Sequence, residues 1–519
     1  MPHAFPSHSP VKPTPKPKDS DGTFLKRWNL PFATVSAVLL LPLAGLADDA
    51  TPAKKPNVLF VVFDDLDPKV GCFGDAFAKT PNMDKLAARG MVFTRAYCQQ
   101  PICNPSRASF MTGRRPDTLG LWSIPTHFRE LHPDMVTMPQ WFMQHGYFAQ
   151  GIGKIYHNYS QKIQGDPASW SVPQLMHWDR HDTEKPVLPA GAPLPPNFAR
   201  DIQNRDGECR DVPDEAYFDG RIANLAMDAL RGFAKKQQPF FLAVGFWKPH
   251  HPFNAPKRYW DLYQRDQVPA IAPADRPRNA PDLAFHANHE FMGMPPKQRT
   301  LDEAAKRELR HGYYAAISYA DAQLGKVLDE LERLDLAKNT MVVVIGDNGL
   351  QVGEHTSWGK MTLFDLDARV PLIIAAPGVA KSGAKTRSLA EMIDVYPTLV
   401  ELCGLPSPNG LDGASLVPIL RDPAKTVKLG ALSQHPRPAL YWGGGPKALP
   451  QVMGYGLFTD RWNYHEWRDF KTGEVVAREL YDGQKDPLET VNLAETQDGK
   501  ALIPPLAAQI KSMTKGTQP

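Results

Sequence analysis

Cysteine is scarce in this sequence, because only five of the 519 residues are cysteines. Such a low content excludes a small scaffold stabilised mainly by disulfides. The sequence also has no large excess of positive or negative charge, since it contains 59 Lys and Arg residues and 56 Asp and Glu residues. The resulting net charge of +3 gives no reason to expect nucleic acid as a partner. The 42% hydrophobic content argues against global disorder and is sufficient for a large core.

One long stretch without any charge stands out, at 28–47. It follows a proline-rich segment, 1–28, that carries all of the net positive charge, and it ends in Gly45-Leu46-Ala47. A basic region, a short apolar core and a small-residue exit predict a disordered leader and signal peptide at 1–47, with cleavage near Ala47. Two prolines interrupt the apolar run, which disfavours the alternative of a transmembrane anchor. We therefore expect export, to a periplasm, an extracellular space or a lysosome-like compartment.

Apolar runs of strand length alternate with helical patterns in the rest of the chain. The run at 57–63 is rich in β-branched and aromatic residues, which is typical of a strand buried on both faces of a parallel sheet. Further strands are predicted at 91–97, 240–246, 341–345 and 371–376, and helices at 80–90, 219–236 and 301–336, the last with a charged, solvated face. This order predicts an α/β fold with a mainly parallel central sheet flanked by helices, over residues 55–420.

The pattern changes after about residue 421. Short strand-like pieces at 452–458 and 475–480 precede a helix near 501–513. They predict a smaller α+β C-terminal subdomain with an antiparallel sheet at 421–519. Two proline-rich segments, 158–215 and 266–300, are too long for ordinary connections, and we expect them to form loops around a functional site.

Acidic residues end two of the predicted strands. Asp64 and Asp65 follow one strand, and Asp347 and Asn348 follow another. Ligands of parallel sheets bind at the carboxyl ends of the strands, and hard oxygen donors suit Ca²⁺ or Mg²⁺. The alternative for each pair is a solvated turn or a helix cap. Asp67 is a weaker candidate ligand and is expected to serve local structure.

The segment Cys103-Asn104-Pro105-Ser106-Arg107 is the most specific motif in the chain, with Thr112-Gly113-Arg114 downstream. Taken alone, Cys103 is either an inert small hydrophobic residue or an acidic thiol nucleophile. The order Cys-x-Pro-Ser-Arg followed by Thr-Gly-Arg resembles the signature of type I sulfatases of the alkaline phosphatase superfamily. In that signature the cysteine is oxidised to formylglycine.

The resemblance covers about 450 residues, in the order expected for sulfatases. It includes Gly153-Lys154 with His157, Lys248-Pro249-His250, Gly346-Asp347-Asn348-Gly349 and Lys360. The stretches 71–75, 112–118 and 247–253 are most similar to the iduronate-2-sulfatase branch. That branch has His where this chain has Asn348, which weakens a claim to the same substrate.

The resemblance also implies a role for each matching residue. Cys103 would become formylglycine, whose hydrate attacks sulfur and later expels sulfate, and this requires a sulfatase-maturation enzyme as a partner. Arg107 would steady the hydrate, and Lys154 and Lys360 would hold sulfate oxygens. His157 would accept a proton from the hydrate and His250 would donate one to the leaving alcohol. A lone Lys or His is otherwise usually a surface charge or a satisfied core residue.

The implied metal ligands are Asp64, Asp65, Cys103 in its modified form, Asp347 and Asn348. Ca²⁺ is expected rather than Mg²⁺, because it tolerates a site shared by protein, hydrate and sulfate. The expected activity is hydrolysis of O-sulfate esters, with a sulfated sugar or polysaccharide as the substrate. The alternatives are a phosphate or phosphonate ester hydrolase of the same superfamily and a non-catalytic glycan-binding protein. The intact motifs argue against the last of these.

Several other residues leave alternatives open. Cys72, Cys98, Cys209 and Cys403 allow three complete disulfide pairings, and their spacing favours none. Asn158-Tyr159-Ser160 is an N-glycosylation sequon. His251 is an alternative to its neighbour His250, and His355 is expected to be a supporting residue. The tryptophans are candidates for sugar stacking, but for each a place in the core is the stronger expectation: Trp122, Trp170, Trp247 and Trp358.

Overall fold

The computed structural model describes residues 55–158, 161–177, 184–188, 192–199, 206–236, 238–287, 290–292, 298–439 and 449–514. The leader and signal peptide predicted at 1–47 lie outside these residues. Among the described helices, none combines the length and the apolar character needed to cross a bilayer.

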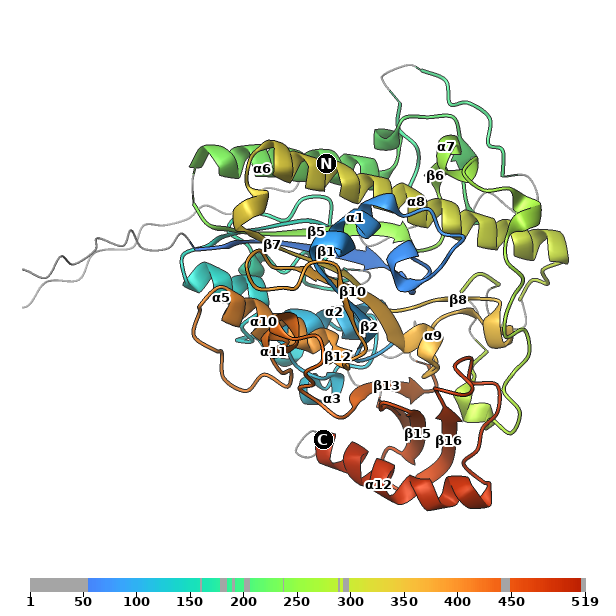
Figure 1. Cartoon of the computed structure of the whole chain (residues 1–519). Coiled ribbons are helices and arrows are strands. Elements are labelled where there is room, and N and C mark those ends of the chain that lie inside the picture. Colours follow the sequence, from blue (N-terminus) through green and yellow to red (C-terminus); the bar gives the residue numbers. More distant parts are fainter. Residues whose placement is uncertain are drawn as a thin grey trace, which may run out of the picture. The chain divides into compact units, whose positions relative to one another are not determined.

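A mixed sheet of eight strands forms the centre of the described chain (Figure 1). Its order is β11-β2-β10-β7-β1-β5-β3, with β12 beside β2. The strands are β1 (Asn57–Asp64), β2 (Met91–Tyr97), β3 (Phe148–Gly153), β5 (Phe240–Pro249), β7 (Thr340–Gly346), β10 (Arg369–Ala375), β11 (Ala384–Thr386) and β12 (Ala390–Glu391). All neighbouring pairs are parallel except those of β10. The predicted α/β fold with a mainly parallel sheet is confirmed.

Helices cover both faces of this sheet (Figure 1). Successive side chains of a strand point to opposite faces, so Leu59 and Val61 of β1 belong to one core whereas Phe60 and Val62 belong to the other. The first core is covered by α1 (Pro81–Arg89), α6 (Phe218–Lys236) and α8 (Glu303–Arg333). The second is covered by α2 (Cys103–Thr112), α5 (Met138–Gln144) and α10 (Val395–Leu402). Because both faces of β1 are buried, the strand contains an uninterrupted apolar run.

Helix α8 is more deeply buried than its charged sequence predicted. It begins after Asp302, whose side chain accepts a hydrogen bond from Ala305 N and caps the helix. In its second half Asp321 accepts hydrogen bonds from Asn82 N at 3.1 Å and Met83 N at 2.7 Å. The sequence predicted that the charged side chains of this helix face solvent. Asp321 is instead buried and caps the N-terminus of α1.

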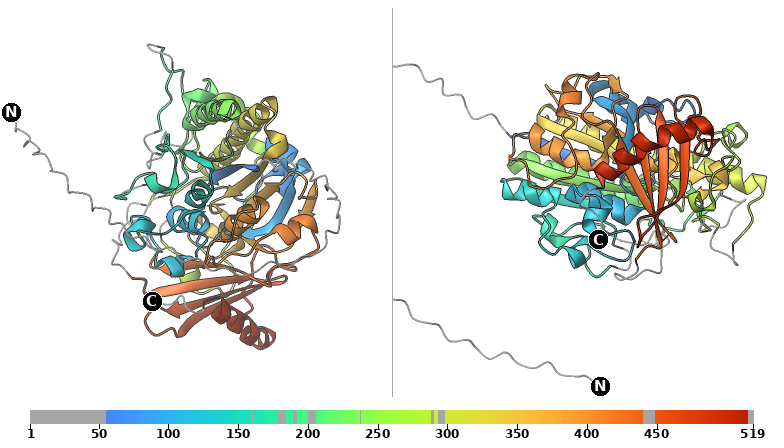
Figure 2. Two further views of the ribbon diagram at one scale, coloured as in Figure 1. Left: turned by 90° about the vertical axis from the view of Figure 1, so that its left-hand side faces the viewer. Right: turned by 90° about the horizontal axis from the view of Figure 1, so that it is seen from below.

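A separate antiparallel sheet lies towards the C-terminus, as predicted (Figure 2). It contains β13 (Ala431–Arg437), β14 (Val452–Phe458), β15 (Trp462–Asp469) and β16 (Val475–Asp482), and α12 (Gln497–Met513) packs on it. Tyr97 of β2 stacks on Phe458 of β14 with ring centroids 4.2 Å apart. The boundary proposed between residues 420 and 421 stays a prediction.

The structure bears on two features that the sequence left open, the pairing of the cysteines and the sequon at Asn158. All five cysteines are buried and free, so none of the three disulfide pairings is formed. Asn158 is buried, and its side chain binds His177 O and Gly165 N. The side-chain amide of Asn158 is therefore not accessible to a glycan in the folded chain, because its nitrogen and its oxygen are engaged by His177 and Gly165.

Candidate active site

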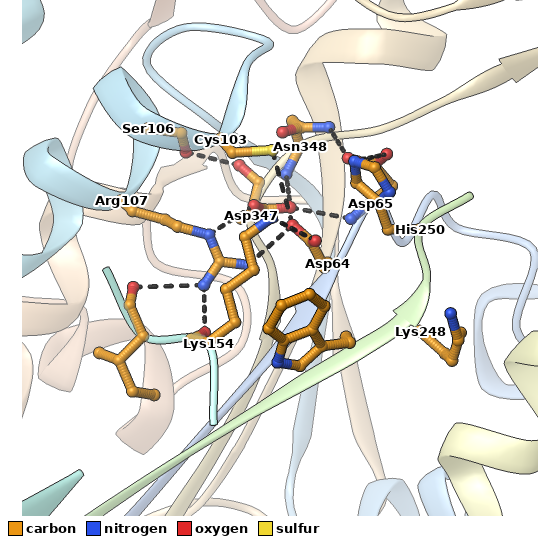
Figure 3. A network of polar contacts seen from close by, with 12 residues as sticks. Asp64, Asp65, Cys103, Ser106, Arg107, Lys154, Lys248, His250, Asp347 and Asn348 are labelled. Carbon is orange, nitrogen blue, oxygen red and sulfur yellow. Dashed lines mark hydrogen bonds and ion pairs between the residues drawn. The ribbon is translucent and has the colours of Figure 1, made fainter. Parts of the chain in front are cut away.

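Acidic side chains meet where β1 and β7 end. The two strands are parallel neighbours in register, so Asp64, Asp65, Asp347 and Asn348 emerge at the same edge of the sheet (Figure 3). Asp65 N donates to Asp347 Oδ1 at 2.9 Å. The first three of these residues each offer a carboxylate oxygen within 4.8 Å of the others, and all are fully buried.

Cys103 begins helix α2 and faces this acidic group. Its Sγ lies 3.6 Å from Asp64 Oδ1 and 3.5 Å from Lys360 Nζ. Burial raises the pKa of the Cys103 thiol well above its usual range, although Lys154 and Lys360 oppose this effect. An unmodified Cys103 is therefore a neutral thiol near neutral pH, and the alternative of an acidic thiol nucleophile does not fit this environment.

Arg107 lies one helical turn after Cys103 and joins the two strand ends. Its Nε donates to Asp347 Oδ2 at 2.8 Å and its Nη2 to Asp64 Oδ1 at 2.9 Å. A third nitrogen, Nη1, donates to Lys154 O and, at 3.2 Å, to Ile155 O. The guanidinium is completely buried, so its planar fork fixes the relative position of helix α2, the two strands and the Lys154 segment.

Two buried lysines complete the cationic side of the site. Lys154 follows β3, and its Nζ lies 2.5 Å from Asp64 Oδ2. Lys360 follows the short strand β9 (Trp358–Gly359), and its Nζ lies 2.6 Å from each carboxylate oxygen of Asp65. Both ammonium groups thus converge on the carboxylates next to Cys103.

Both predicted histidines are buried in the same region. His250 Nε2 lies 3.1 Å from Glu290 Oε1 and 3.6 Å from Asp65 Oδ2, while its Nδ1 contacts the His251 carbonyl. Both ring nitrogens therefore face oxygen atoms that can accept a hydrogen bond. Burial, followed by the charge of Lys154, holds the pKa of His157 well below its usual range. His157 is therefore neutral near neutral pH.

Glu290 belongs to the site but was not predicted. It lies in the loop segment 266–300, and its Oε2 is 3.4 Å from Lys360 Nζ. Burial alone would raise its pKa, but the charges of Lys360 and His250 hold it well below the ordinary value. A lone Glu in an irregular segment carries no motif, so no sequence signal marked it.

Other candidate side chains serve the surrounding structure. Lys248 turns away from the carboxylates (Figure 3), and its Nζ binds Glu184 Oε2 at 2.7 Å. Asp67 pairs with Lys69, and His251 lies 3.1 Å from Asp206. His355 binds Leu488 O at 2.9 Å as a supporting residue, and the tryptophans that were candidates for sugar stacking are all buried: Trp122, Trp170, Trp247 and Trp358.

The Lys360 segment is held from the C-terminal sheet. Arg437 of β13 donates from Nη1 to Met361 O at 3.2 Å and from Nε to Leu283 O at 2.9 Å. His286 Nε2 lies 2.7 Å from Lys360 O. Met361 has φ 81, a left-handed conformation that is uncommon for a non-glycine residue. These contacts fix the backbone that aims Lys360 at Asp65.

The strand end that carries His250 is anchored by a buried acid. Asp219 of α6 accepts hydrogen bonds from Trp247 N at 2.8 Å and Lys248 N at 3.0 Å. Burial raises the pKa of Asp219 to about 7. In the unfolded chain an Asp titrates near 3.9, so between these values the folded state binds more protons than the unfolded state.

We predict that Asp219→Asn makes stability less dependent on pH. Because the pKa is raised on folding, the free energy of unfolding of the wild type falls as pH rises from about 4 to 7, by up to about 4 kcal/mol. The amide of the variant does not titrate, so the free energy of unfolding of the variant does not fall in this way. Urea unfolding across that pH range should show that the free energy of unfolding of the variant increases relative to that of the wild type as pH rises. If the difference in free energy between the two proteins did not change with pH, the raised pKa of Asp219 would be contradicted.

The donor set at the strand ends fits a hard divalent cation. It consists of three carboxylates and the amide of Asn348, whose Nδ2 donates to Asp65 Oδ1 at 2.8 Å. Asn348 Oδ1 is buried and accepts no hydrogen bond from any residue that the structure describes. Buried oxygens of this kind suit Ca²⁺ or Mg²⁺ rather than a soft metal.

Comparisons with known proteins agree with this geometry. The family model described as Sulfatase matches residues 56–405, and the one described as N-sulphoglucosamine sulphohydrolase, C-terminal, matches residues 353–516. The chain is 30% identical to iduronate 2-sulfatase of Mus musculus over 89% of this chain and 95% of that protein.

Solved structures share the fold. The structure of BT4656 with its substrate D-glucosamine-2-N,6-O-disulfate matches with a TM-score of 0.66 at 20% identity, over 89% of this chain and 98% of that one. Phosphonate monoester hydrolase of Agrobacterium radiobacter matches with a TM-score of 0.68 at 22% identity, over 89% and 96%. The extent of the family match and the iduronate 2-sulfatase relative show that this chain belongs to the sulfatase family, the sulfuric ester hydrolases with the alkaline phosphatase fold.

Proposed function

We propose that the chain is an exported sulfatase that hydrolyses O-sulfate esters of sulfated sugars through a formylglycine made from Cys103. The observation that carries this proposal is the position of Cys103 Sγ, 3.5 Å from Lys360 Nζ and beside Asp64. The substrate class is supported by relatives named iduronate 2-sulfatase and by the glucosamine disulfate bound to BT4656.

Modification of Cys103 would resolve a chemical difficulty of the site. A buried thiol whose pKa is raised is a poor nucleophile. Oxidation to formylglycine would instead place a hydrated aldehyde at the start of α2, with one hydroxyl for attack and a second for release of sulfate. This step requires a sulfatase-maturation enzyme as a partner.

The buried cations are suited to a tetrahedral oxyanion. Lys154 lies beside Asp64 and Lys360 beside Asp65, and each would hold sulfate oxygens whose charge grows during transfer. Arg107 keeps Asp64 and Asp347 in place through two hydrogen bonds. Because the three cations are enclosed, their attraction for sulfate is stronger than that of exposed charges.

The two histidines divide the proton transfers. His157, neutral because of its burial, accepts a proton from the attacking hydroxyl. His250, whose Nε2 lies 3.1 Å from Glu290 Oε1, donates a proton to the leaving alcohol oxygen. Glu290 acts as a positioning residue, since its contact with Nε2 fixes the orientation of the His250 ring.

The proposed metal is Ca²⁺, held by Asp64, Asp65, Asp347, Asn348 and the modified Cys103. It would polarise a sulfate oxygen and lower the pKa of the attacking hydroxyl. Ca²⁺ is favoured over Mg²⁺ because it tolerates irregular sets of six to eight oxygen ligands. The proposal of export is supported by the sequence of the leader at 1–47.

Matched substrates test the reaction type. The two candidate esters present similar tetrahedral oxyanions, and a phosphonate monoester hydrolase shares the fold. For the matured protein we expect kcat/KM for an aryl sulfate to exceed that for the corresponding aryl phosphate by at least about tenfold. A preference for the phosphate or phosphonate ester would instead assign the chain to phosphoryl transfer.

A further inference from the structure

A cavity whose lining contains none of the active-site residues is rich in basic side chains. Its volume is about 490 Å³, within the usual range of about 300–1,000 Å³ for ligand sites. We call it the basic groove. Its charged lining consists of Arg95, Arg369, Lys385 and Arg387, with Asp365 as the one acidic residue among the described residues that line it.

The acidic residue of the basic groove is already engaged. Asp365 Oδ2 accepts from Arg369 Nε at 2.6 Å, and its Oδ1 accepts from Tyr97 OH at 3.2 Å. Arg95 contacts Asp460 Oδ1 at 3.6 Å, but the Asp460 side chain is 83% exposed. The Arg95 guanidinium also donates to the carbonyl oxygens of Thr459 and, at 3.1 Å, Asp460, which hold it at the edge of the groove.

Two of the four cations have no partner in the described part of the chain. Lys385 lies on β11 and Arg387 directly follows this strand, on either side of the buried Thr386. Alternate residues of an extended strand point to the same side, so both exposed cations face the groove together. No carboxylate of the described residues lies within ion-pair distance of either.

We propose that the basic groove binds a stretch of an acidic, sulfated glycan chain as a second contact outside the Cys103 site. The nature of this ligand rests on the proposed function. Guanidinium and ammonium groups match sulfate and carboxylate oxygens, while Phe73, which also lines the groove, offers an apolar face to a sugar ring. Without the leader the sequence has no net charge, so attraction for a polyanion has to come from local groups such as these.

The position of the groove also suits a substrate that extends beyond the reacting sugar. Tyr97 ends β2 and lines the groove, and the chain passes from there to Cys103 at the start of α2. Asp365 begins α9 (Asp365–Ala368), shortly after Lys360. The groove is thus lined by residues from segments that adjoin, in the chain, those carrying the nucleophile and one sulfate-binding lysine.

Charge reversal at the two unpartnered cations tests the proposal. The variant Lys385→Glu/Arg387→Glu is compared with Lys471→Glu/Lys511→Glu, which changes the net charge equally at exposed lysines outside the groove. Binding of a long heparin oligosaccharide is measured by calorimetry on full-length chains that also carry Cys103→Ala. We expect about tenfold weaker binding for the groove variant only, with a smaller dependence on salt.

The outcomes separate the groove from the proposed function. In the matured Cys103 background, kcat/KM for a small aryl sulfate should be the same in both variants. Equal oligosaccharide affinity of the two variants would overturn the proposal and leave Lys385 as a charge that protects an edge strand. Equally tight binding of single-stranded DNA would overturn the assignment to glycans. If no sulfate ester is hydrolysed by the wild type but the affinity difference persists, the proposed function fails and the groove stands.

Discussion

Cys103→Ala should reduce kcat for sulfate ester hydrolysis by at least about 10⁴-fold, while the chain stays folded. Residues that act together as one catalytic unit lose nearly all activity when the nucleophile is removed. The Cys103 side chain is small and contacts mainly polar groups, so its truncation leaves the apolar core intact. Initial rates with an aryl sulfate, together with the melting temperature, measure both effects.

Cys98→Ala is the matched control for this prediction. Cys98 is also buried and free, and its Sγ lies 3.8 Å from Asp367 O rather than in the acidic group. It should keep activity within about tenfold of wild type, because the variant loses only packing and one weak thiol hydrogen bond. If Cys103→Ala retained activity comparable to that of Cys98→Ala, Cys103 would not be the nucleophile.

Asp65→Asn should lower kcat/KM by at least about 100-fold and remove the rise in melting temperature caused by Ca²⁺. Asp65 contacts Lys360, His250 and Asn348, so its charge is central to the proposed metal site. Its backbone has φ 61, which Asn tolerates better than most residues. The substitution therefore removes charge with little backbone strain, and thermal unfolding with and without Ca²⁺ measures the result.

Asp67→Asn provides the comparison two residues further along. Asp67 is equally buried but is engaged by Lys69 through its side chain and through Lys69 N at 3.0 Å. We expect this variant to keep the Ca²⁺-dependent rise in melting temperature, whatever its effect on basal stability. A rise that persists in Asp65→Asn, or disappears equally in both variants, would contradict the assignment of Asp65 as a ligand.

Much of the fold could be predicted from local patterns. The uninterrupted apolar run of β1 and the long periodic segment of α8 were recognised because each element is buried or amphipathic along its whole length. β3 was missed, since Phe148–Gly153 is short and contains two glycines. The antiparallel direction of β10 was not predicted either, because direction depends on tertiary connections rather than on local sequence.

The residues of the site also differ in whether the sequence could predict them. Asp64 and Asp347 could be placed together because residues that follow neighbouring parallel strands share one edge of the sheet. The roles of Lys154 and His250 came from the resemblance to sulfatases. Glu290 had neither a periodic pattern nor a motif to mark it, and only the folded loop brings it to within 3.1 Å of His250.

Peptide mass spectrometry of the segment that contains Cys103 tests the central claim most directly. After expression with a sulfatase-maturation system, we expect this peptide to be about 18 Da lighter than the encoded sequence, because sulfur is replaced by oxygen and two hydrogens are lost. The aldehyde should also react with a hydrazide probe. A Cys103 peptide that keeps its encoded mass and an alkylatable thiol, in protein that hydrolyses sulfate esters, would contradict the formylglycine mechanism.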